Sequence, residues 1–191
     1  MNAARPWLFV SVLLLAACAP KAAVRLSYVP QPGVSPILGA GKSSISLGGA
    51  DARAVKDRIS ATRNGLGFEV SPIPAENDPL QFVLGAVAAE LQSRGFQVGD
   101  GPARVTVTLK KLYNTFGVGV FSTTTLGEAE LLVEVKGPGT RSYSADVQGD
   151  HRLKGIMRFS GENAKAAVEA ALAKALGTLF DDKAFLAALL P

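Results

Sequence analysis

Few side chains in this 191-residue chain have the type and spacing that chemistry requires. His151 is the single histidine, and it follows a stretch that alternates like a strand. A hydrolytic triad would need a nucleophile on a strained turn, and the sequence contains no Gly-x-Ser-x-Gly. A zinc site would need several convergent ligands, which one histidine without a thiolate cluster does not supply. We therefore expect a solvated loop histidine, no catalytic residue, no metal and no cofactor.

Glu128 and Glu130 form a carboxylate pair whose spacing is suggestive of acid-base chemistry. Residues two apart on a strand lie on one face, and glycosidases work with two carboxylates. The strand expected beside them offers threonine and lysine side chains, however, so cross-strand ion pairing at the surface is the simpler interpretation. An enzyme that acts on cell-wall glycan or lipid through Glu128, Glu130 or His151 is the alternative.

Cys18, the only cysteine, ends the tetrapeptide Leu15-Ala16-Ala17-Cys18. A basic residue and then an apolar run over residues 7–15 precede it, as in a secretory signal. That run is shorter than the roughly 20 apolar residues that cross a bilayer. The tetrapeptide resembles the bacterial lipobox, in which the cysteine thiolate accepts a diacylglycerol and a peptidase cuts before it. We expect a signal peptide over residues 1–17 and an acylated Cys18; an ordinary secretory peptide cut elsewhere is the alternative.

The residue after the lipobox cysteine bears on the destination of the chain. In lipoproteins of this type an aspartate there favours retention in the inner membrane, whereas this sequence has Ala19. The resemblance therefore implies the outer membrane of a bacterium that has two. Because one acyl chain binds a bilayer only marginally, two or three make a stable anchor. We expect a body tethered by lipid and facing the periplasm.

The charge balance argues against one class of partner. The chain has 20 basic and 16 acidic residues, a formal net charge of +4. So small a balance on an exported chain does not favour binding to nucleic acid. Another envelope protein, a cell-wall polymer or anionic headgroups are the candidate partners, and the oligomeric state is left open.

Two segments could form contact surfaces. Basic side chains gather among acidic ones, in a pattern that suits an anionic group but is more typical of a solvated loop; they are Arg53, Lys56, Arg58 and Arg63. Apolar residues and glycines fill residues 116–121, where a polar turn would be expected. If this tip is exposed it is a contact surface, with Val118, Val120 and Phe121 as its candidates. Alternatively the strands run on and bury these side chains.

Capping residues and apolar repeats predict two long helices, each with an apolar stripe. The pair Asp78-Pro79 predicts a helix start, and Gly95 predicts its end. A second long helix is capped by Ser160 or Asn163, and Asp181-Asp182 caps a short terminal helix. Each long helix repeats apolar residues every three or four positions, so each must cover a partner surface.

Alternation predicts the sheet. Strands are expected around residues 44–47, 68–70 and 96–98, with a three-stranded meander over residues 105–109, 129–135 and 143–147. The phase shifts at Lys110-Lys111, which indicates a bulge or twist. Residues 18–42, rich in proline and glycine, predict an extended tether with one early strand. The most economical solution is one α+β domain over residues 43–191, in which two main helices pack on one face of an antiparallel, partly mixed sheet.

The order of these segments resembles that of a known family. The lipobox, residues 44–53, the helix end at residues 91–98, the long hairpin and the C-terminal helix are together similar to the YajG-type bacterial lipoproteins. The resemblance implies an envelope lipoprotein without an established activity and supplies no catalytic residue. The hairpin tip departs from the family, because apolar residues and glycines replace a more polar stretch.

The sequence as a whole favours an outer-membrane-anchored periplasmic lipoprotein that is not an enzyme. We expect it to bind another envelope component through its sheet face or hairpin tip. Three alternatives stay open: an auxiliary lipoprotein of a lipid-transport system, to which there is a more distant likeness, a cell-wall or lipid-acting enzyme, and a purely structural lipoprotein.

Overall fold

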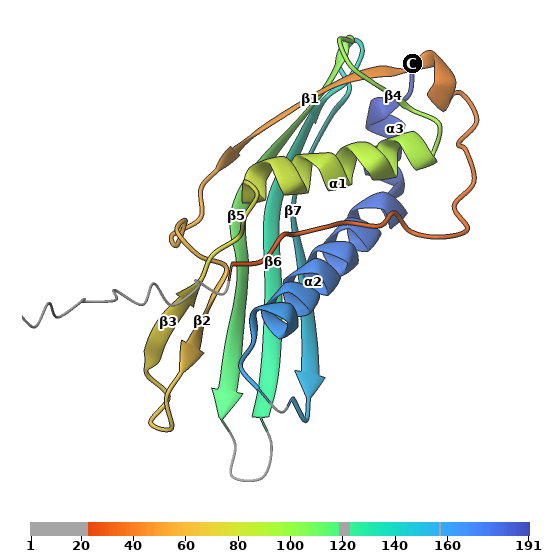
Figure 1. Ribbon diagram of the computed structural model, residues 1–191. Coiled ribbons are helices and arrows are strands. Elements are labelled where there is room, and N and C mark those ends of the chain that lie inside the picture. The colour runs from red at the N-terminus through yellow and green to blue at the C-terminus, as the bar shows by residue number, and fades with distance from the viewer. Residues whose placement is uncertain (1–22, 119–122, 157) are drawn as a thin grey trace, which may run out of the picture.

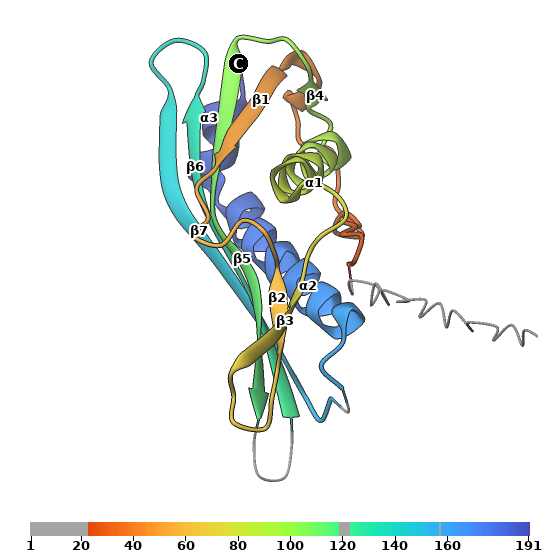
Figure 2. The same ribbon diagram turned by 60° about the vertical axis from the view of Figure 1, so that its left-hand side comes forward.

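The computed structural model describes residues 23–118, 123–156 and 158–191, which form a seven-stranded mixed sheet with helices on one side (Figures 1 and 2). The strands are β1 (Ser44–Asp51), β2 (Ser60–Arg63), β3 (Glu69–Ile73), β4 (Gln97–Val98), β5 (Ala103–Val118), β6 (Thr123–Lys136) and β7 (Ser142–Lys154). The helices are the 3-10 turn η1 (Ala40–Lys42), α1 (Pro79–Ser93), α2 (Gly161–Asp181) and α3 (Lys183–Leu189). This is the α+β class that the sequence predicts.

The three longest strands form an antiparallel meander, in which β6 lies between β5 and β7. The other edge of β5 pairs in parallel with β1, and further along it pairs with β2 at Asn114. β4 adds a short parallel pair to β1, and β3 closes a hairpin with β2. Sequence alternation revealed the meander, but it carried no signal for the parallel partners, because their pairing depends on the crossover through α1 rather than on a local turn.

β5 contains the predicted irregularity. Its pairing with β6 shifts register between Leu109 and Lys111. Because of the extra residue, Lys110 and Lys111 both avoid the core, while Leu109 and Leu112 are both buried. The bulge therefore reconciles the phase shift in the sequence with one continuous apolar face.

The helices begin at the predicted caps. Asp78 accepts a hydrogen bond from the Gln81 amide at 2.8 Å, and Ser160 caps α2. Gly95 has φ 90° after the end of α1, as a left-handed stop requires. Asp182 caps α3. Within the described part of the chain, no helix combines the length and the apolar character needed to cross a membrane.

α2 rests directly on the backbone of the meander. A Cβ atom built on Gly127 would lie 2.1 Å from the carbonyl oxygen of Ala167, and one built on Gly149 would lie 2.1 Å from that of Ala171. Only glycine allows the helix backbone so close to the strands. The side of the sheet against α1, α2 and α3 is thus sealed, and we call it the helix face.

The described part of the predicted tether packs against the fold. Val24 and Leu26 are buried, and Val24 forms a parallel bridge with Ala75 just after β3. The expected early strand is reduced to that bridge. Residues 27–42 then run past α2 and α1 to η1 (Figure 1). Cys18 and the predicted signal peptide lie outside the described residues.

Candidate functional site

The opposite side of the sheet, which we call the open face, carries polar and half-buried side chains. In the part of the chain that the structure describes, no helix covers it (Figure 2). Its members alternate with the buried residues of β5 and β6; they are Thr106, Thr108, Lys110, Lys111, Tyr113, Glu128, Glu130 and Leu132. Thr108, Leu132 and Asp146 lie side by side across three strands. The open face is therefore a mixed surface of apolar and charged groups.

Lys111 forms ion pairs with both candidate carboxylates, Glu128 and Glu130, on this face. Its Nζ lies 2.8 Å from Glu128 Oε1 and 3.8 Å from Glu130 Oε1. Lys110 pairs with Asp146 of β7. The predicted cross-strand ion pairs are thus present, and the carboxylates are engaged in them.

His151 lies elsewhere. The prediction of a loop position is wrong, because β7 continues through His151 to Lys154. Its register partner is Gly127, whose missing Cβ faces α2, so His151 belongs to the helix face. The fold therefore separates His151 from Glu128 and Glu130, so these three candidate residues do not lie at one site.

Arg53 is turned inward at the edge of the open face. It lies in the loop of residues 52–59 between β1 and β2, and only 3% of its side chain is exposed. Its Nε and Nη2 donate to the Asp51 carboxylate at 3.0 and 2.8 Å. The bond from Arg53, opposed by burial, holds the pKa of Asp51 below its ordinary value. Arg53 is thus a fixed part of the loop rather than a mobile surface cation.

A cavity of about 330 Å³ separates this loop from the bulge of β5. Its lining comes from the loop, the bulge and β6; the residues are Arg53, Ala54, Val55, Lys110, Lys111, Leu112, Tyr113 and Glu130. Among the described residues, nothing accepts a hydrogen bond from the buried Arg53 Nη1. A buried donor left unpaired costs about 1–3 kcal/mol, so an acceptor that reached Nη1 would be held strongly.

The rest of the predicted basic segment does not form one positive patch. Arg58 contacts Asp57 at 3.1 Å and Glu69 at 3.0 Å, and Arg63 contacts Glu69 at 3.4 Å. Lys56 is exposed. The structure therefore divides the segment into a buried Arg53 and a charge-balanced group around Glu69.

The predicted contact tip is described in part. Phe116 is buried, with its ring centroid 4.9 Å from that of Phe159, so the strand continues into the core at this point. Val118 ends β5. The side chain of Val118, together with Val120 and Phe121, lies outside the described residues.

Glu90 is a buried site that the sequence analysis missed. Its Oε1 accepts from the Tyr28 hydroxyl at 2.5 Å and from the Gln31 amide at 2.8 Å, while Oε2 pairs with Arg94. Burial opposes the charge, but these hydrogen bonds outweigh it and hold the pKa of Glu90 below its ordinary value. The available signal was that Glu90 interrupts the apolar stripe of α1, because it lies beside Leu91 at a position that the helix buries.

This buried cluster fastens the N-terminal segment to the helices. Arg94 Nη2 donates to Gln31 Oε1 at 2.8 Å, and its guanidinium lies 4.3 Å from the ring centroid of Phe180. Further along, Leu26 exchanges hydrogen bonds with the Asn77 side chain at 2.9 and 3.1 Å. The chain is therefore held in place as far as Val24, beside β3.

The comparisons with known proteins concern the family and the fold. The sequence matches the family described as "Uncharacterized lipoprotein" over residues 31–189. The fold is similar to the crystal structure of a Xanthomonas campestris protein of the DUF330 family, with a TM-score of 0.55 and 15% identity over 83% of this chain and 92% of that one. A crystal structure of an uncharacterized protein aligns with a TM-score of 0.42 and 13% identity, over 81% and 96% of the two chains. No curated protein matches the sequence.

The family match includes the open face, the cavity lining and the Glu90 cluster from Gln31 onward. It confirms the resemblance to YajG-type lipoproteins. The chain belongs to the family of uncharacterized lipoproteins whose model spans its residues 31–189.

Proposed function

We propose that the protein is an acylated outer-membrane lipoprotein whose open face docks another protein of the envelope, without catalysing a reaction. The observation that carries the docking role is the asymmetry of the sheet. One face is sealed by helices, while the other presents half-buried threonine and leucine side chains among fixed ion pairs.

The composition of the open face fits a protein surface. Its charged groups have both signs, and the cavity beside Arg53 holds about 330 Å³. A second hollow of about 410 Å³ lies over β1 and is bordered by Arg104 and Thr106. A partner whose side chains enter these hollows would bury the apolar groups between the ion pairs, as the centres of protein interfaces do.

A non-catalytic role is supported by the positions of the candidate reactive groups. Glu128 and Glu130 both lie beside Lys111, and His151 is on the other face of the sheet. A general acid and base must reach the same substrate atoms. An enzyme that paired His151 with one of these carboxylates would need a rearrangement of the meander, and one that used Glu128 with Glu130 would have to compete with Lys111 for both carboxylates.

The anchor rests on Cys18 and on membership of a lipoprotein family. The intact mass of the native protein from membranes tests it. We expect a chain that begins at Cys18 and carries acyl groups, and a Cys18→Ser variant that keeps its leader. A native chain that retains residues 1–17 and no lipid would contradict the proposal.

Crosslinking in intact cells tests the docking role. Lys110 and Lys111 supply amines on the open face for a lysine-reactive reagent. We expect mass spectrometry to recover a specific envelope protein joined to these two lysines. Recovery of none, or of crosslinks confined to lysines of α2, would contradict docking through the open face.

A further inference from the structure

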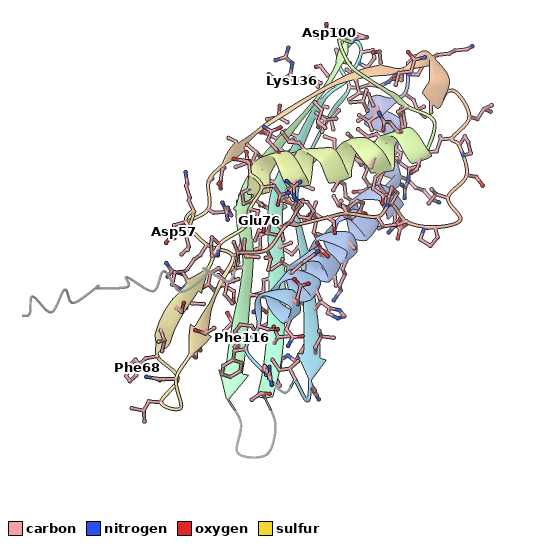
Figure 3. All side chains as sticks on the ribbon, in the orientation of Figure 1. Asp57, Phe68, Glu76, Asp100, Phe116 and Lys136 are labelled. Atoms are coloured by element: carbon pink, nitrogen blue, oxygen red, sulfur yellow. The ribbon has the colours of Figure 1, made fainter. Side chains whose placement is uncertain are left out.

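The β2–β3 hairpin exposes a group of large apolar side chains. Leu66 is 82% exposed, Phe68 67% and Val70 65%. Phe68 lies at the free end of the hairpin, away from the helices (Figure 3). Single exposed apolar residues are normal at a protein surface, but neighbouring ones mark a contact site.

The hairpin holds these residues in a fixed arrangement. The Asn64 side-chain oxygen accepts from the amides of Leu66 at 3.1 Å and Phe68 at 3.0 Å, and Gly67 has φ 85°. Leu66, Phe68 and Val70 lie within five consecutive residues around this turn, and the pairing of β3 with β2 shifts register beside Val70. The turn therefore presents its apolar groups together, with Leu66 at the tip.

The chain enters the described fold close to this hairpin. Val24 donates to the Pro74 carbonyl at 3.1 Å and accepts from the Glu76 amide at 2.8 Å, directly after β3. Cys18 lies five positions before Ala23, and Val70 lies five positions before Ala75. Each stretch spans at most about 17 Å. An acylated Cys18 would therefore hold the membrane surface within reach of β3.

The charges beside the hairpin are balanced. Arg58 and Arg63 both pair with Glu69 of β3, and Arg58 also pairs with Asp57, so two cations face two anions. A surface without net charge gains little attraction to anionic lipid. Its binding to a membrane would therefore come from insertion of the apolar side chains. A lipid leaflet is an occupant that fits both the exposed apolar tip and the short distance to the anchor.

We propose that Leu66, Phe68 and Val70 form a second membrane contact, which inserts into the leaflet that holds the acyl chains of Cys18. This inference rests on the proposed anchor. The anchor and the hairpin together would fix the orientation of the body, because two separated contacts remove the freedom to swing about one tether.

A fluorophore that responds to polarity tests this contact in the full, membrane-purified protein. Phe68→Cys is labelled with a thiol-reactive probe, and the protein is reconstituted in phosphatidylcholine vesicles. Asp100→Cys is the matched control, because Asp100 is exposed and lies at the far end of the molecule (Figure 3). Val70→Cys gives an independent reading from the same hairpin. The unsubstituted chain is exposed to the probe in parallel, since an acylated Cys18 has no free thiol.

We expect no label on the unsubstituted chain. At position 68 the emission should shift to the blue, and quenching by aqueous iodide should fall severalfold relative to position 100. Adding phosphatidylglycerol should leave both values unchanged. If the unsubstituted chain takes no label but positions 68 and 70 are quenched as strongly as position 100, the hairpin contact is overturned while the anchor stands. A label on the unsubstituted chain contradicts the anchor, and this inference with it.

Discussion

The helix face and the open face of the same sheet differ in how their side chains are packed and paired. On the helix face, glycines admit the backbone of α2, and the buried Glu90 has a partner for each oxygen. On the open face, surface lysines hold carboxylates across strands, and buried Arg53 keeps one nitrogen without a partner among the described residues. The helix face is packed and hydrogen-bonded by the described chain itself, whereas the open face has groups that a binding partner could still contact.

Arg53 and Arg94, the buried arginines among the described residues, show this difference most clearly. Arg94 lies among Glu90, Gln31 and the ring of Phe180, which belong to its own helix, the N-terminal segment and α2. Arg53 pairs with Asp51, two residues away, donates through Nη2 to the Lys56 carbonyl at 3.4 Å, and lines a cavity. A buried charge with a full set of partners stabilises one conformation, whereas a partly satisfied one is a place where a ligand can add a bond.

Loss of the Glu90 carboxylate should have the largest effect. Glu90→Ala leaves the Arg94 charge buried without its anion, and breaking a buried pair in this way costs about 3–5 kcal/mol. The free energy of unfolding in urea measures it. Glu162→Ala, at an exposed position in the first turn of α2, is the control. Equal stability of the two variants would mean that the helix face does not depend on this cluster.

The next largest difference in stability is expected between a methyl group added on the helix face and one added on the open face. Gly127→Ala places a Cβ against the backbone of α2, and such overpacking costs about 1–3 kcal/mol. Gly48→Ala adds a Cβ that meets nothing within 4 Å, and it should cost nothing or stabilise the strand by about 0.5–1 kcal/mol. Thermal unfolding of the two variants tests the pair. A Gly127→Ala protein as stable as Gly48→Ala would disprove the close contact of α2.

Acid should weaken the helix face through Glu90. The pKa of Glu90 is lower in the folded protein than in the unfolded chain, whose glutamates titrate near pH 4. The unfolded state therefore takes up the proton first, so the stabilisation is present above about pH 4 and is lost as the pH falls through the folded pKa. Urea unfolding between neutral and acid pH should show a smaller loss for Glu90→Gln than for the unsubstituted protein. Parallel pH profiles would contradict this role of Glu90.

The smallest effect on stability is expected on the open face. Lys111→Ala removes ion pairs whose partners are partly exposed, and such pairs contribute about 0–1 kcal/mol. The variant should fold almost as stably as the unsubstituted chain, while less of the envelope partner co-purifies with it from solubilised membranes, a readout that does not use the Lys111 amine. A large loss of stability with unchanged partner recovery would make these pairs structural and would remove the distinction between the faces.

Much of the architecture was predictable because local signals carry it. The cap at Asp78, the stop at Gly95 and the alternation of the meander each depend on neighbouring residues. The parallel edge was not predictable, since β1 finds β5 only after the chain has passed through α1. The described part of the predicted tether was misjudged because its hydrogen bonds go to Glu90 and Asn77, which are distant in sequence.

The candidate site was predictable only in outline. The carboxylates and lysines of the open face follow from strand period and from the phase shift at Lys110-Lys111. The inward turn of Arg53 does not, because an isolated arginine beside an aspartate is usually solvated. The exposure of Leu66, Phe68 and Val70 was also not predictable, because apolar residues in a sequence are expected to be buried and nothing local marks these three as exposed.

Photo-crosslinking from one position on each face tests the central claim most directly. A photoreactive amino acid at Leu132 lies at the middle of the open face, and the same group at Ala166 lies on the exposed side of α2. With both proteins at equal abundance in intact cells, we predict a discrete envelope-protein adduct from position 132 and none from position 166. An adduct from position 166 alone, or from neither position, would contradict the assignment of the open face as the docking surface.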